Sequence, residues 1–211
     1  MAKVHPNMVP APGAVVVQAA TSIAERAEEA PTTLTVWRKS LLFDCKGFTV
    51  FDAKGNLAYR VDSYASETGD EVVLMDAAGR PAFTVRRKRF SLHGEQWLVF
   101  AGEETRRPVY AVRRSGRGKM MAHVTACAGG GASPSSPSYE VEGSYARRCC
   151  VVYDGERRAV AEVSPSPKEV VGTDVFRLVV QPGVGASLAM AVVVALEQMF
   201  ARPSLLRSWS T

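Results

Sequence analysis

The residues best suited to chemistry are few and lie far apart in this sequence. Three histidines occur, and one of them, His93, follows Ser91 by two residues, which would place both side chains on one face of a strand. A hydroxyl beside an imidazole could supply a nucleophile and a base, but neither an acid partner nor a G-x-S-x-G elbow accompanies the pair. We interpret it as a turn whose side chains cap backbone groups, and we expect a non-enzymatic protein.

Phosphate-loop and metal motifs are also missing. The nearest glycine-rich stretch, Gly116-Arg117-Gly118-Lys119, lacks the upstream glycine and the hydroxyl residue of a P-loop, so it predicts a basic hairpin tip. The cysteines form no C-x-x-C pair and have no histidines at zinc spacing. We therefore expect reduced thiols, no metal and no cofactor. The four cysteines are Cys45, Cys127, Cys149 and Cys150.

Positive charge is concentrated in the stretch 80–119, which holds eleven Lys or Arg against three acidic residues, although the whole chain has a net charge of only +5. Because Arg86 and Arg113 end equivalent strands of neighbouring predicted hairpins, we expect the cluster to gather at one end of the fold. Such a surface suits the phosphates of lipid headgroups or of nucleic acid. The candidate phosphate- or lipid-binding residues are Arg86, Arg87, Lys88, Arg89, Arg113 and Arg114.

Three interpretations of this charge remain open. The cluster could dock on anionic phospholipids or phosphoinositides, or it could serve a nuclear protein- or DNA-interaction factor. It could also be a solvated belt that keeps the protein soluble. Nucleic-acid binding would favour exposed aromatic side chains between the basic ones, and Phe90 and Trp97 are the candidates, unless both belong to the core.

Repeated hairpins are the elements that must position these residues. Three segments combine a strand, a charged turn and a second strand ending in aromatic-x-Val, and they begin at Phe48, Val72 and Leu98. A fourth begins at Cys149 and has an Asp154-Gly155 turn. In the second strands, the aromatic residue and the valine share one face, which predicts an antiparallel meander with an apolar side.

The stretch SLAMAVVVALEQMFA, from Ser187 to Ala201, is apolar around its whole helical circumference except at Glu197 and Gln198. Such a helix must be buried, and its longest apolar run is too short to cross a bilayer. The alternative is a central strand at Val192–Val194, since β-branched residues favour strands. We favour the helix because strands rarely reach fifteen residues. Its predicted core residues are Leu188, Met190, Val193, Val194 and Met199.

The organisation along the chain fits one domain. We expect a loosely ordered extension over 1–33, a barrel domain over 34–201 with a flexible Gly/Ala/Ser/Pro loop at 126–138, and a tail over 202–211. The N-terminus is a poor signal peptide and no N-x-[ST] sequon occurs, so the protein is expected in the cytoplasm, with a peripheral membrane or nuclear position open. We expect a monomer with an anionic lipid or protein partner; nucleic acid is not excluded.

The ordered string of motifs WRKSLLFDCKGFTVFDAKGNLAYRVDSY, EVVLMDAAGRPAFTVRRKRFSLHGEQWLVFAG, YEVEGSYARRCCVV, VGTDVFRLVVQPG and SLAMAVVVALEQM closely resembles the plant LURP-one-related family. That family is similar to the Tubby C-terminal domain and to phospholipid scramblases. The resemblance implies an α+β, mainly β fold: a closed antiparallel barrel of about twelve strands around a hydrophobic C-terminal helix. It also implies a plant source and a link to defence and stress responses.

The chain departs from this family in one place and from its wider relatives in others. Gly185 stands where the family commonly has an Asp before the central helix, so we expect another group, such as Ser187, to cap that helix. The phosphoinositide-binding positions of Tubby domains cannot be carried onto this sequence by any motif. Calcium-binding and membrane-insertion elements of scramblases are not evident either. The basic cluster is therefore a prediction from charge alone.

Overall fold

The computed structural model describes residues 30–38, 46–63, 70–90, 94–116, 118–127, 138–166 and 174–200. Within them the chain forms twelve strands and one α-helix, with a short 3₁₀ turn, η2 (Tyr145–Arg147), before the tenth strand. The elements are β1 (Thr32–Trp37), β2 (Lys46–Phe51), β3 (Leu57–Ser63), β4 (Glu71–Asp76), β5 (Pro81–Arg87), β6 (Gln96–Ala101), β7 (Tyr110–Arg114), β8 (Met120–Ala126), β9 (Ser138–Ser144), β10 (Cys149–Tyr153), β11 (Ala159–Pro165), β12 (Val175–Val180) and α1 (Ala186–Phe200).

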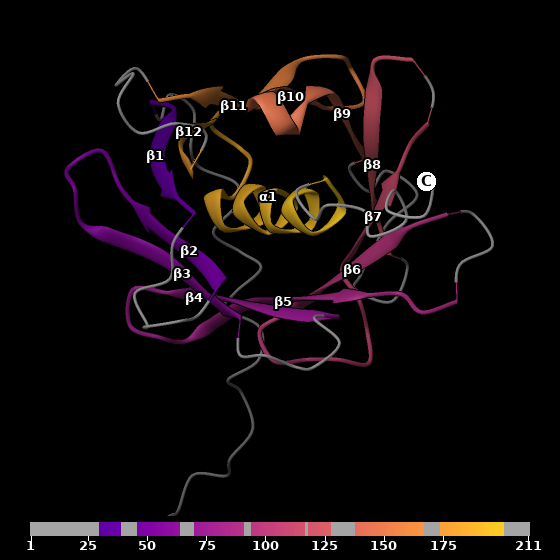
Figure 1. The fold of residues 1–211 in the computed structure, drawn as a ribbon, viewed down its shortest axis with the longest axis horizontal. Coiled ribbons are helices and arrows are strands. Elements are labelled where there is room, and N and C mark those ends of the chain that lie inside the picture. Colours follow the sequence, from indigo (N-terminus) through magenta and orange to yellow (C-terminus); the bar gives the residue numbers. More distant parts are fainter. Residues whose placement is uncertain are drawn as a thin grey trace, which may run out of the picture.

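The strands close into an antiparallel barrel in which each strand pairs with its neighbours in sequence. The closing pair joins β1 to β12, from Thr32 opposite Val180 to Trp37 opposite Val175. Figure 1 shows α1 lying inside the ring of strands. The expected barrel around a C-terminal helix is thus confirmed, and the predicted hairpins correspond to β2–β3, β4–β5, β6–β7 and β10–β11.

Three of the hairpin turns begin with an aspartate whose carboxylate accepts hydrogen bonds from the backbone of the turn. The Asp76 carboxylate accepts the backbone N–H groups of Ala78 and Arg80, both at 2.9 Å, and Asp52 and Asp154 accept in the same way. This is the local hydrogen bonding by which short polar side chains set a turn. Hydrogen bonds lower the pKa of all three carboxyl groups: the largest cause is the side-chain amide of Asn56 for Asp52, and the backbone N–H of Arg80 and of Arg158 for Asp76 and Asp154.

The fourth predicted hairpin differs from expectation in its backbone. Gly55 and Gly79 have φ near +85° and +82°, but the equivalent place in the Asp154 turn belongs to Arg157, with φ 64°, and not to Gly155. Left-handed backbone is unfavourable for a residue with a β-carbon. The Arg157 guanidinium contacts both Glu140 and Glu142, at 2.9 and 3.0 Å, which offsets part of that cost.

Helix α1 fills the barrel, and the alternative central strand at Val192–Val194 is wrong. Met190, Val193, Val194 and Met199 are buried among inward-facing strand residues, while Leu188 is partly buried against the same core. The all-round apolar surface explains this position, because every side of a central helix faces a strand. The expected cap is wrong: α1 begins at Ala186, so Ser187 lies within its first turn. The side chain of Ser187 instead hydrogen-bonds to Tyr59.

A buried arginine sits beside the C-terminal half of α1. Arg148 ends η2 with a left-handed backbone, φ 54°, and only 4% of its surface is exposed. Its guanidinium lies 4.4 Å from the ring centres of both Tyr145 and Phe176. Stacking on two aromatic faces is one of the few environments that accept a desolvated cation.

Several predicted segments fall outside the described residues. Most of the predicted 1–33 extension and the 202–211 tail lie there, as do residues 128–137 of the 126–138 loop and the Ser91 and His93 pair. Ala126 and Ser138, at the two ends of that loop, belong to β8 and β9. In the described part of the chain, no helix combines the length and apolar character that crossing a bilayer requires.

Candidate anion-binding site

The predicted basic residues meet at one end of the barrel. Strand β6 lies between β5 and β7, and its first residue, Gln96, pairs with Arg113 on one side and accepts the backbone N–H of Lys88 on the other, at 2.9 Å. Lys88 and Arg113, 25 positions apart in sequence, therefore flank the same residue. We call this region the basic end, and it consists of Arg86, Arg87, Lys88, Arg89, Arg113, Arg114 and Lys119.

Not every charge of the 80–119 stretch belongs to this group. Arg80 lies in the β4–β5 turn, and Arg106 and Arg107 lie in the β6–β7 connection, which are at the opposite end of the barrel. Arg117 is outside the described residues. The expectation of one gathered cluster is therefore met by the six candidate residues and Lys119, while three other arginines are far from them.

Acidic residues that sequence reasoning did not connect to the cluster neutralise part of it. Arg86 pairs with Glu71, while Arg87 and Arg89 approach Asp70 to 4.0 and 3.8 Å. Both acids stand at the start of β4, which pairs with β5, so strand pairing alone brings them there. Few basic side chains at this end are left without a carboxylate partner. In the described part of the chain, no ion pair joins Lys88 or Arg113 to a carboxylate.

Arg114 differs from the other candidates because it contacts the central helix. Its guanidinium donates to the backbone oxygen of Met199 at 3.5 Å, lies 4.7 Å from the centre of the Phe200 ring and approaches Glu95 to 3.6 Å. A cation at a helix C-terminus is stabilised by the helix dipole. Arg114 thus anchors the end of α1, and its charge is less available to a ligand.

The two aromatic candidates have opposite environments. Trp97 is fully buried in the core, and its indole N–H donates to Glu95 at 3.3 Å. Phe90 follows Arg89 directly in the β5–β6 connection and is 92% exposed. This phenylalanine therefore stands next to four consecutive basic residues, and moving its side chain out of water would be favourable.

A surface cavity of about 420 Å³ lies among the basic residues. Three cations line it together with two carboxylates, and an anion entering it would compete with Asp70 for Arg87 and Arg89. The lining residues are Asp70, Arg87, Lys88, Arg89, Gly94 and Glu95.

The structure gives no metal site in the part of the chain that it describes, where no three His, Cys, Asp or Glu side chains are grouped suitably. His123 lies within β8, opposite Arg113. The arrangement of charges at the basic end can bind anions by ion pairing and hydrogen bonding.

Comparison with known proteins places the chain in a family. The model of the LURP-one-related family matches residues 32–197. The chain is 40% identical over 182 residues to protein LURP-one-related 8 of Arabidopsis thaliana, covering 82% of this chain and 89% of that protein. It is 41% identical over 181 residues to protein LURP-one-related 5 of the same plant, with 80% and 83% covered. The chain belongs to the LURP-one-related family.

A solved structure agrees with the barrel. A crystal structure of an Arabidopsis thaliana protein is similar with a TM-score of 0.60 and 28% sequence identity, covering 80% of this chain and 91% of that one. The resemblance seen in the sequence motifs is thereby confirmed at the level of family and fold, and the Arabidopsis relatives support the plant source.

Proposed function

We propose that the chain is a non-enzymatic binding module that docks on anionic phospholipid membranes through the basic end. The observation that carries this proposal is Phe90, which is almost fully exposed directly beside Arg86–Arg89. A basic surface with a protruding aromatic side chain is the combination that peripheral proteins use at a membrane surface. The family resemblance suggests plant defence or stress signalling as the setting, with the protein reaching the membrane from the cytoplasm.

The expected binding free energies support the basic residues and Phe90 acting together at the membrane. Each basic residue near an anionic leaflet contributes roughly 1 kcal/mol, and burying a phenylalanine side chain contributes about 1.5 to 3 kcal/mol. Because Asp70, Glu71 and Glu95 partly neutralise the arginines, charge alone would give weak binding. Insertion of Phe90 at the headgroup level supplies the additional free energy.

The alternative nucleic-acid function is less well supported. Proteins that bind single strands present several aromatic side chains on which successive bases stack. Among the described residues, Phe90 is the one large aromatic side chain exposed beside the basic cluster, since Trp97 is in the core and the half-exposed Trp37 lies on β1, four strands away from β5. A single aromatic residue suits insertion into a membrane interface better than it suits a row of bases.

Vesicle sedimentation tests the proposal. Wild-type protein should sediment at low salt with vesicles that contain phosphatidylserine or phosphoinositide but not with pure phosphatidylcholine, and salt should weaken binding because it screens exposed charges. Replacing Lys88 and Arg113 by Ser should reduce binding, whereas the same change at Arg106 and Arg107 removes equal charge from the opposite end and should have little effect. Both double variants should melt near the wild-type temperature.

The variant Phe90→Ser separates insertion from charge. It should weaken membrane binding that persists at high salt while leaving the low-salt component. If wild-type protein ignores anionic vesicles, or if the two double variants lose binding equally, membrane docking through the basic end is wrong. Tighter, salt-dependent retention on DNA than on vesicles would favour the nucleic-acid alternative.

A further inference from the structure

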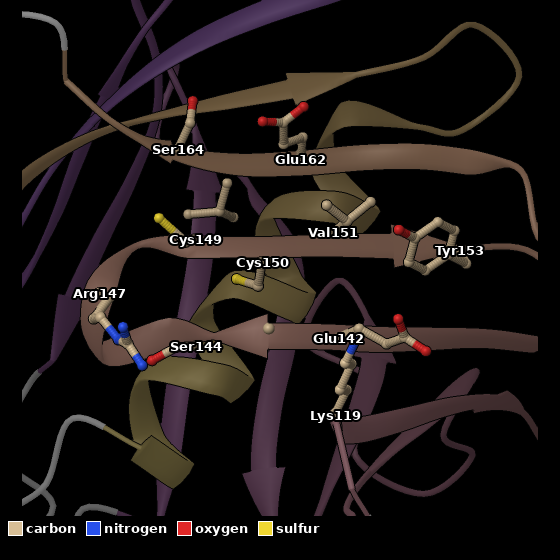
Figure 2. A pocket seen from close by; sticks show the side chains of 12 residues that line it. Lys119, Glu142, Ser144, Arg147, Cys149, Cys150, Val151, Tyr153, Glu162 and Ser164 are labelled. Carbon is tan, nitrogen blue, oxygen red and sulfur yellow. The ribbon is translucent and has the colours of Figure 1, made fainter.

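A second hollow lies on the outer face of β9, β10 and β11, away from β5–β7, with a volume of about 570 Å³. Figure 2 shows β10 along its floor, with Cys149, Val151 and Tyr153 in one row. The intervening Cys150 is buried, because alternate residues of a strand face opposite sides. Volumes of 300 to 1,000 Å³ are typical of small-molecule sites. We call this hollow the β10 groove.

One end of the groove carries hydrogen-bond donors and positive charge. Ser144 pairs with Cys149 in the register of β9 and β10, and Ser164 lies beyond Cys149 on β11, one step from the Cys150–Val163 pair. Arg147, in η2, is exposed at the same end, whereas Figure 2 shows Lys119, just before β8, beside Glu142. In the described residues, no ion pair joins Arg147 to a carboxylate.

The middle of the groove is apolar and the far end is aromatic. Val151 lies between Glu142 and Glu162 in the strand register, and Tyr153 follows at the end of β10. Glu142 is already engaged by Arg157, whose guanidinium also lies 4.5 Å from the centre of the Tyr153 ring. An elongated ligand therefore meets a cationic end first and then a valine and an aromatic ring.

The backbone beside the groove is unusually close-packed, which shapes the wall between β9 and β10. Gly143 has φ +112°, and a β-carbon there would lie 2.3 Å from the backbone oxygen of Cys149. Its N–H donates to the backbone oxygen of Lys119 at 3.1 Å, so the same glycine also holds the start of β8 at the groove. Only glycine fits this position without moving the lining residues.

We propose that the β10 groove binds a small carboxylate-bearing molecule with an apolar or aromatic body. The carboxylate accepts hydrogen bonds from Arg147 and the hydroxyl group of Ser144, and the body lies on Val151 and Tyr153. Charge complementarity sets this orientation, because Arg147 stands at one end of the groove while Glu142 and Glu162 stand beside Val151. The site does not depend on the membrane-docking proposal, since it shares no lining residue with the cavity at the basic end and shares only Lys119 with the basic end itself.

The experiment uses 1-naphthoate as the probe and 1-naphthalenemethanol as its neutral counterpart, with amide NMR of the full chain as the readout. Naphthoate should shift the resonances of Ser144, Cys149 and Val151 in a saturable way, and the neutral alcohol should bind about tenfold more weakly, the factor expected for a lost charge-assisted hydrogen bond. Bound naphthoate should also slow alkylation of Cys149, which lies exposed on the groove floor.

Arg147→Gln should weaken naphthoate binding about tenfold without changing the melting temperature, because Arg147 is exposed. The matched control Arg106→Gln removes the same charge at a distant turn and should leave binding unchanged. Val151→Asp places a negative charge on the floor and should abolish binding. The proposal is overturned if naphthoate gives no saturable shifts, if Arg147→Gln binds like wild type, or if the shifts cluster at Arg87–Arg89 instead.

Discussion

The carboxylate of Glu197 on α1 lies 3.2 Å from the guanidinium of Arg148, and both side chains are buried. The same carboxylate pairs with Arg38, at the end of β1, which is half-exposed. One acidic residue of the central helix is thus tied to two separate points of the strand shell, near β1 and beside η2.

Removing the buried carboxylate should destabilise the protein strongly. Glu197→Gln removes the carboxylate that pairs with the buried Arg148 cation, and breaking a buried pair from one side costs about 3 to 5 kcal/mol. Chemical denaturation followed by tryptophan fluorescence measures this, because Trp97 is in the core.

Two further variants test whether the cost comes from burial. Arg38→Met removes a cation from the same carboxylate at a solvated position, so it should cost about 1 kcal/mol or less. The double variant Arg148→Met with Glu197→Gln should cost less than the sum of its single variants. Equal costs for Arg38→Met and Glu197→Gln would show that burial of the pair is not the source of its importance.

The aspartate turns predict a pH dependence of stability. A carboxyl group with a lowered pKa stabilises the folded state above its unfolded pKa of about 3.9, and this contribution is lost as the pH falls through the folded value. The pKa of Asp76 is lowered, first by the backbone N–H of Arg80. Wild type should therefore melt at a higher temperature than Asp76→Asn at neutral pH, and the difference should shrink in acid. A difference independent of pH would contradict this.

The adjacent cysteines should react very differently with iodoacetamide. Cys149 is exposed, whereas burial raises the pKa of the Cys150 thiol to about 12. At about pH 8 the native protein should be alkylated at Cys149 and not at Cys150, since the thiolate is the reactive form. Peptide mapping by mass spectrometry separates the two sites. In denaturant both cysteines should react. Equal labelling of the two cysteines in the native protein would show that the register of β10, which exposes Cys149 and buries Cys150, is wrong.

Local patterns made the architecture predictable. The hairpins follow from alternating strands around Asp-containing turns, and the all-round apolar surface of residues 187–201 requires a helix surrounded by strands. The gathering of Lys88 and Arg113 could also be foreseen, because equivalent strand ends of neighbouring hairpins meet at one side.

The remaining features depend on residues that only the closed barrel brings together. Arg148 and Glu197 are 49 positions apart, so in the sequence Glu197 looks like a mere interruption of an apolar helix. The charge count of the 80–119 stretch likewise omitted Asp70 and Glu71, which lie outside it and reach the arginines through strand pairing. The β10 groove arises from three adjacent strands and from Gly143, whose close backbone contact cannot be recognised from any sequence motif.

Pairing of the first strand with the last determines when this protein can fold during synthesis. One edge of β1 stays unpaired until residues 175–180 have been synthesised, and α1 is made only after β12. During synthesis, β1 to β11 therefore emerge before the barrel can close, and their apolar face and unpaired edges are exposed until β12 and the helix are available. Closure of the barrel therefore comes after synthesis of all the other strands, and truncation before residue 186 leaves a shell without the helix that fills it.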